Sequence, residues 1–212
     1  MYSLLSAVFL KSLYTKNNLI PGKLTVAKDE ILIIESRSAK DIYDDRYEGA
    51  TLKEVLKLQG ISAKHLEVIN KAYFEKAIKY AANEHIKYVH FSGHGSEDGI
   101  ALTDGFITRK ELDQIAWPHL KDTCLCFSSC DIAKGVEEIF EYHKSFCNAV
   151  IAPTRKITWG EGLVAFSALY HRALSCSTSS NQDVRVLNHI VGAGTFSFIA
   201  SAFRSTTYSV GQ

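Results

Sequence analysis

The chain has 212 residues, of which 46% are apolar, and this length suits one domain with a substantial core. Lys and Arg number 24 and Asp and Glu number 23, which leaves a formal net charge of +1. This balance excludes the strong positive field with which proteins hold nucleic acids or anionic membranes. No apolar run approaches the roughly 20 residues that a membrane-spanning helix needs. We therefore expect neither nucleic acid nor membrane among the partners.

The five cysteines are an odd number, and all of them lie in the second half of the chain. A secreted disulfide framework uses an even and dispersed set, so we expect free thiols in a reducing compartment, the cytoplasm. The first ten residues are apolar and resemble the core of a signal peptide. They lack a basic start, and no small-residue cleavage site follows Lys11. We expect this segment to form a buried strand or helix.

Short apolar runs alternate with amphipathic stretches along the first half of the chain. Runs with the length and β-branching of strands come at 31–34, 65–69 and 88–91. Apolar residues at helical spacing come at 51–60 and 71–85. The polar stretch 36–49 is expected to be a loop, and 98–105 a small hairpin.

The second half continues the same alternation. Thr108, followed three residues later by Glu111, has the pattern of a capping box and predicts the start of a helix. Further strands are expected at 123–127, at 148–152 and at about 195–203. Further helices are expected at 136–146, at 163–174 and from about 184.

Strands that alternate with helices predict an α/β fold. Parallel strands need crossover connections, and right-handed crossovers place helices on both faces of the sheet. We therefore expect a three-layer α/β/α sandwich with a mostly parallel sheet. Neither an internal repeat nor a linker divides the chain, so residues 1–212 are expected to form a single domain.

Two predicted strands end in residues that can carry chemistry. The third strand runs into Ser-Gly-His94-Gly95, and the fourth into Ser-Ser-Cys130-Asp131. Ligands of open α/β sheets bind at the carboxyl ends of the strands, where these side chains would meet if the strands are neighbours. A thiol becomes a nucleophile beside an imidazole, and the N–H groups of Gly95 and Cys130 could hold a developing oxyanion.

Other interpretations of these residues remain open. Taken singly, a histidine beside glycine or a cysteine after a strand is more often structural than catalytic. Cys124 and Cys126, together with Cys130 and His94, could be zinc ligands, but no second ligand cluster completes a zinc site and a core role is favoured. We expect no metal and no cofactor.

Here the sequence resembles a known family, the CHAT-type caspase-like cysteine peptidases. The stretch His90-Phe-Ser-Gly-His94-Gly95, with the following Gly-Ile-Ala-Leu-Thr-Asp-Gly, is similar to their histidine block. The stretch Leu125-Cys-Phe-Ser-Ser-Cys130 is similar to their cysteine block. The resemblance covers roughly residues 30–176, the motif-bearing core.

The resemblance implies a caspase–haemoglobinase-like sandwich and a cysteine endopeptidase. It matches the family's catalytic histidine to His94, its nucleophile to Cys130 and its oxyanion glycine to Gly95. The caspase pattern Gln-Ala-Cys-Arg-Gly is absent, because Ser129 precedes the cysteine and Asp131 follows it. The chain is therefore not a close relative of the caspases.

Four residues are candidates for substrate binding. They are Arg37, Asp131, Trp159 and Glu161. Acidic residues outnumber basic ones in 36–49, and with Asp131 they favour a basic or neutral residue before the cut. If Arg37 instead points into the pocket, an acidic residue is selected.

Three functions are compatible with these observations. The first is a Cys-His endopeptidase that cleaves a protein substrate. The resemblance to the family implies an immune or cell-death effector in antiviral defence. Such an effector cuts a protein encoded nearby, for example a pore-former. An activating partner fits the same interpretation. The second is a catalytically silent binding module, and the third is a redox-sensing thiol protein centred on Cys130.

Overall fold

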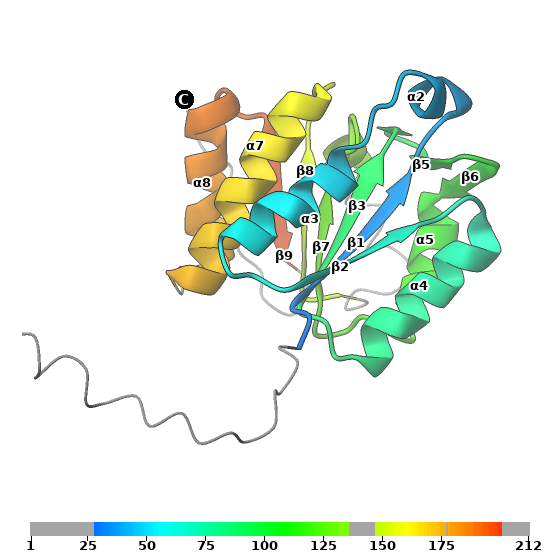
Figure 1. Ribbon diagram of the computed structural model, residues 1–212, viewed down its shortest axis with the longest axis horizontal. Coiled ribbons are helices and arrows are strands. Elements are labelled where there is room, and N and C mark those ends of the chain that lie inside the picture. The colour runs from blue at the N-terminus through cyan, green and yellow to red at the C-terminus, as the bar shows by residue number, and fades with distance from the viewer. Residues whose placement is uncertain (1–27, 136–146, 177, 201–212) are drawn as a thin grey trace, which may run out of the picture.

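The computed structural model describes residues 28–135, 147–176 and 178–200. In these ranges a six-stranded sheet has the order β2-β1-β3-β7-β8-β9, and all neighbours are parallel except β8 and β9 (Figure 1). Its strands are β1 (Ile31–Ser36), β2 (Ala63–Glu67), β3 (Tyr88–Gly93), β7 (Cys124–Phe127), β8 (Ala149–Pro153) and β9 (Phe196–Ala200). A small antiparallel sheet follows β3, made of β4 (Gly95–Ser96), β5 (Gly99–Leu102) and β6 (Gly105–Thr108).

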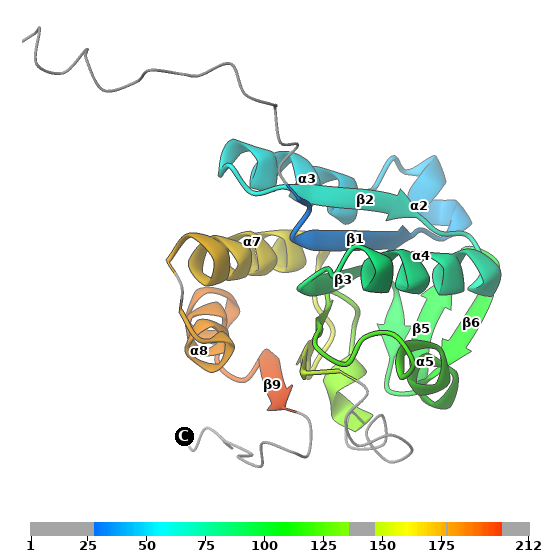
Figure 2. The same ribbon diagram turned by 90° about the horizontal axis from the view of Figure 1, so that it is seen from below.

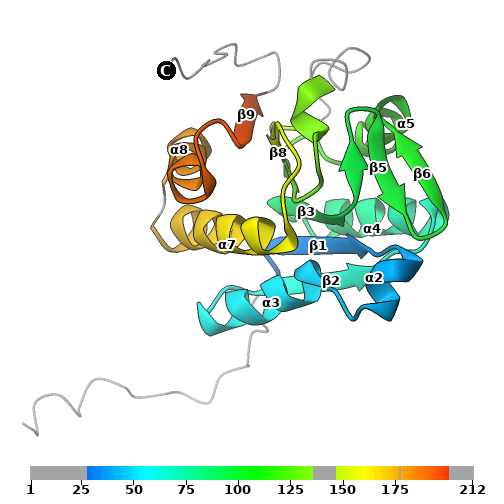
Figure 3. The same cartoon turned by 90° about the horizontal axis from the view of Figure 1, so that it is seen from above.

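Helices cover both faces of the large sheet, as Figures 2 and 3 show. On one face lie α3 (Glu48–Leu58), α7 (Trp159–Tyr170) and α8 (Ser180–Val191). On the other lie α4 (Lys71–Asn83) and α5 (Arg109–Ala116). Shorter elements are α2 (Ala39–Tyr43), the 3₁₀ turn η1 (Ile132–Gly135) and the π-helical turn η2 (His171–Ser175). The predicted three-layer α/β/α sandwich with a mostly parallel sheet is confirmed.

The central strands are mostly apolar because both of their faces are buried. Every residue of β1 is buried: Leu32 and Ile34 pack toward α4 and α5, whereas Ile31 and Ile33 pack toward α3 and α7. The edge strand β2 is only half-buried. This is the pattern expected of a parallel sheet enclosed between helical layers.

Several element boundaries differ from the sequence predictions. The stretch 36–49 is not only a loop, because it contains α2 and the first two residues of α3. The predicted helix at 163–174 begins four residues earlier, at Trp159, where Thr158 and Glu161 form a capping box. The capping box of Thr108 and Glu111 is present as predicted.

Two predictions lie outside the described residues: the apolar segment at 1–10 and the helix at 136–146. Among the helices of the described ranges, none combines the length and the apolarity needed to cross a bilayer.

Candidate active site

The predicted strand ends are neighbours in the sheet. β3 pairs directly with β7 in parallel, with Phe91 beside Phe127. His94 follows β3 immediately, and Cys130 lies three residues beyond β7. Parallel neighbours place their carboxyl ends at one edge of a sheet, so the two residues share that edge, onto which Figure 3 looks.

His94 is bound by a carboxylate that the sequence analysis did not assign to it. Its Nε2 lies 2.7 Å from Oδ2 of Asp41 on α2. The carboxylate is almost fully buried, whereas half of the imidazole is exposed. Because Nε2 is occupied, Nδ1 is the ring nitrogen left to face a reacting group.

A capping box places Asp41 where His94 can reach it. Ser38 is the N-cap of α2, and both its backbone N–H and its hydroxyl donate to the Oδ2 atom that also contacts His94. Burial acts to raise the pKa of Asp41, but the hydrogen bonds from Ser38 and His94 outweigh it and the pKa is lowered. The carboxylate therefore stays charged at neutral pH. The Ser-x-x-Asp pattern is the sequence signal that could have identified this helix start.

Cys130 sits on a sharp turn of the backbone. It is half-buried, and its Sγ lies 3.6 Å from the carbonyl oxygen of Ile157, to which the thiol donates. The next residue, Asp131, has a φ of 61°, in the left-handed region that non-glycine residues seldom adopt. Strained backbone of this kind is concentrated at functional sites, where the surrounding structure holds it in place.

Gly95 packs directly against the cysteine turn. A Cβ atom at Gly95 would lie 2.8 Å from Cβ of Ser129 and 3.2 Å from the carbonyl oxygen of Cys130. Only glycine allows the two strand ends to approach this closely. The residues proposed to hold the oxyanion, Gly95 and Cys130, are thus in contact.

Trp159 lies beside His94. Their rings meet edge to face, with 5.5 Å between centroids, and Trp159 is half-buried at the first position of α7. Since Ile157 contacts the thiol and Trp159 contacts the imidazole, the short segment that leads into α7 touches both strand ends.

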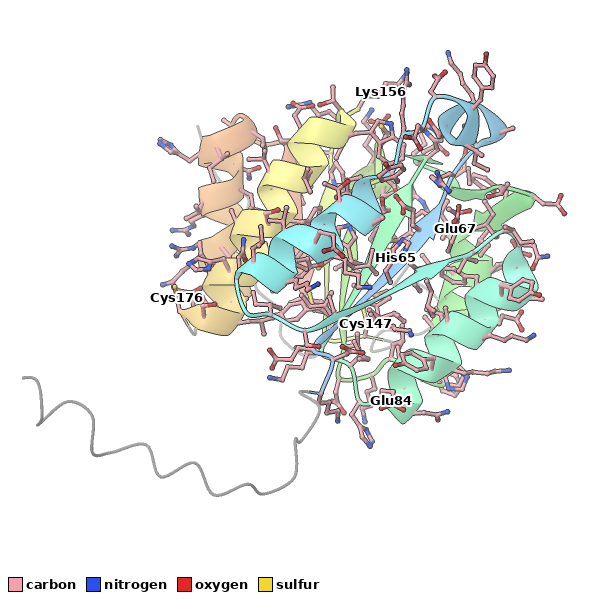
Figure 4. All side chains as sticks on the ribbon, viewed as in Figure 1. His65, Glu67, Glu84, Cys147, Lys156 and Cys176 are labelled. Carbon is pink, nitrogen blue, oxygen red and sulfur yellow. The ribbon has the colours of Figure 1, made fainter. Side chains whose placement is uncertain are left out.

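The other three candidates for substrate binding have partners within the chain. Arg37 is hydrogen-bonded to Glu67 at the end of β2, a residue labelled in Figure 4. Asp131 lies 2.7 Å from Lys134. Glu161 caps α7 and pairs with Arg155, and these bonds lower its pKa to about 2.

A second polar group, centred on His90, lies beneath this edge of the sheet. His90 is fully buried, with Nδ1 3.0 Å from the hydroxyl of Tyr170 and Nε2 3.1 Å from that of Ser128. Ser128 in turn donates to Glu48 over 2.8 Å. Because His90, Glu48 and Ser128 are all buried, a substrate cannot reach them. Their hydrogen bonds instead link β3 and the end of β7 to the helices packed on the sheet.

The other cysteines are poor nucleophiles or lie elsewhere. Cys124 and Cys147 are buried, and the pKa of each is raised well above its ordinary value: hydrogen bonding to Cys126 is the main cause for Cys124, and burial for Cys147. Cys176 is exposed beyond α7, away from this edge (Figure 4). Within the described ranges, no three His, Cys, Asp or Glu side chains are grouped so that they could hold a metal ion.

Comparison with known proteins identifies the fold. No protein-family model matches the chain, and no curated protein matches it either. Solved structures do match, among them a complex of the pro- and mature domains of RgpB from Porphyromonas gingivalis and the Arg-specific cysteine proteinase gingipain R (RGPB). Each superposes with a TM-score of 0.51 at 13% identity over 81% of this chain.

The chain spans slightly less than half of these proteins, 47% and 46% of their lengths. At such low identity the likeness shows the fold alone. The chain therefore has the α/β caspase-like fold of gingipain R.

Proposed function

We propose that the chain is a cysteine endopeptidase in which Cys130 is the nucleophile and His94 the general base and acid. The observation that carries the proposal is the hydrogen bond between His94 and the buried Asp41, at the strand end next to that of Cys130. A nucleophile, a base and a group that orients the base are the parts that covalent catalysis requires.

The chemistry follows from this arrangement. Nδ1 of His94 accepts the thiol proton, and the thiolate of Cys130 attacks the carbonyl carbon of the scissile peptide bond. The N–H groups of Gly95 and Cys130 hold the oxyanion. His94 then gives its proton to the leaving amine, which departs as the new N-terminus and leaves a thioester on Cys130. Water, deprotonated by His94, attacks the thioester; the C–S bond breaks, the new carboxyl terminus is released, and His94 returns the proton to the thiolate of Cys130.

Asp41 orients the imidazole and stabilises the imidazolium during both steps. As a buried carboxylate it fixes the tautomer by accepting from Nε2–H, so that Nδ1 is free to take the proton of the thiol. The fold supports this proposal, because gingipain R, which shares it, is an Arg-specific cysteine proteinase.

The finer assignment rests on the resemblance of the motifs. We place the chain among the CHAT-type caspase-like peptidases and in the cytoplasm. Its substrate is a protein, for which a pore-former encoded nearby is a candidate, and cleavage then serves antiviral immunity or cell death. A partner protein is a candidate activator.

The deciding experiment is co-expression of the chain with the proteins encoded beside it. Wild type should produce a cleaved fragment, and Cys130→Ala should produce none while its circular dichroism and melting temperature stay unchanged. His94→Ala should lower the rate by several orders of magnitude, because nucleophile and base act as a unit. Cleavage that survives in Cys130→Ala would refute the proposal and return the chain to the binding-module interpretation.

A further inference from the structure

Four charged side chains near Cys130 and His94 are paired within the chain. Each has a partner of opposite sign at 2.7 Å, counting His94 in its protonated form. The pairs are Arg37–Glu67, Asp41–His94, Asp131–Lys134 and Glu161–Arg155. These pairs bear on which substrate residue the proposed peptidase recognises.

Asp131 is the carboxylate nearest in sequence to the nucleophile, and it is not free to bind a cation. Only 14% of its side chain is exposed, and the hydrogen bond to its carboxylate raises the pKa of Lys134. A basic substrate side chain could pair with Asp131 only by displacing Lys134, which exchanges one cation for another without adding a charge pair.

Arg37, likewise, is not free to bind an acidic substrate side chain. Its Nε and Nη2 atoms both donate to Oε1 of Glu67, at 2.9 and 2.7 Å, and its guanidinium lies 5.7 Å from the ring centre of Tyr47. Only 16% of the side chain is exposed. A substrate carboxylate would have to compete with Glu67 for a site that is already formed.

We propose, building on the peptidase function above, that the substrate side chain received beside Cys130 is uncharged and apolar. The half-buried ring of Trp159, next to His94, offers it an apolar surface. A charged side chain placed there would lose water without finding a free partner in Arg37, Asp131 or Glu161, whereas an apolar side chain has no charge to desolvate.

Peptide acyloxymethyl ketones test the proposal on the full chain. Three probes differ only in the residue next to the reactive ketone, Leu, Arg or Asp, and intact mass measures how fast each one modifies Cys130. We expect the Leu probe to react at least about tenfold faster than the other two. Faster reaction of the Arg or the Asp probe overturns the inference but leaves Cys130 as the nucleophile. If none of the probes modifies Cys130, the proposed function itself fails, and the inference fails with it.

A variant of Lys134 tests whether its ion pair with Asp131 is what disfavours a basic substrate residue. Lys134→Ala removes the partner of Asp131, so the Arg probe should gain about tenfold relative to the Leu probe. Lys79→Ala, which removes an exposed lysine from α4, is the matched control and should leave the ratio unchanged. A ratio that stays the same in Lys134→Ala would contradict the role given to the ion pair.

Discussion

Asp41 and His94 are separated by 53 positions in the chain and joined by a hydrogen bond of 2.7 Å. Asp41 is the one buried residue of α2, so this short helix is anchored through the same carboxylate that orients the imidazole. The placement of α2 and the orientation of His94 are therefore linked. Loss of the Asp41 carboxylate should therefore affect both the stability of the chain and its activity.

Asp41→Asn should lower kcat on the order of 100-fold and leave KM nearly unchanged. The substitution keeps the shape of the side chain but removes the charge that stabilises the imidazolium. Peptide hydrolysis measured beside a thermal melt separates the catalytic effect from loss of fold. Asp44→Asn, at the C-cap of the same helix, is the control and should retain full activity. Equal losses in both variants would mean that α2 acts only through its overall stability.

Stability should depend on pH through Asp41. Its pKa is lowered in the folded chain from the ordinary value of 3.8, so its contribution is complete above about pH 4 and is lost as the pH falls through the folded value. Urea unfolding of wild type and Asp41→Asn from about pH 7 down to pH 3 should show the wild-type advantage shrinking below about pH 4. A difference that stayed constant over this range would rule out Asp41 as a titrating contributor.

Gly95→Ala should impair both stability and activity. The new methyl group would lie 2.8 Å from Cβ of Ser129 and 2.9 Å from Cδ1 of Ile132, so the turn that carries Cys130 must move. Such overpacking costs about 1–3 kcal/mol, measured as the free energy of unfolding in urea. Gly160→Ala is the matched control: the nearest atom lies 4.0 Å away, and the exposed helical position should gain about 0.5–1 kcal/mol.

The left-handed conformation of Asp131 predicts an order of stability among its variants. Asp131→Gly, Asp131→Asn and Asp131→Leu all lose the ion pair with Lys134, so they differ mainly in backbone strain. Glycine should be the most stable and leucine the least, with a gap of about 1–2 kcal/mol between them. Chemical denaturation of the three proteins measures the order. A leucine variant as stable as the glycine variant would show that this φ carries no strain.

The fold and the two strand-end residues could be predicted from the sequence because their signals are local. Apolar runs and helical spacing revealed the alternation of strands and helices, and alternation implies parallel strands whose carboxyl ends share one edge. His94 directly follows one such strand, and Cys130 lies three residues beyond another. Their placement at one edge required only that β3 and β7 be neighbours, as they are.

The tertiary structure determines the partners of the charged residues near the site. The sequence presented Arg37, Asp131 and Glu161 as free to meet a substrate, and it presented 36–49 as a loop. In the folded chain each of the three has an ion-pair partner, and the apparent loop contains the helix that brings Asp41 to His94. The pair Arg37–Glu67 and the contact Asp41–His94 join distant segments and depend on which strand ends lie side by side, whereas the local pairs Asp131–Lys134 and Arg155–Glu161 depend on side-chain geometry within a few ångströms. Periodicity in a sequence carries no such information, and so the third member of the site emerged only from the fold.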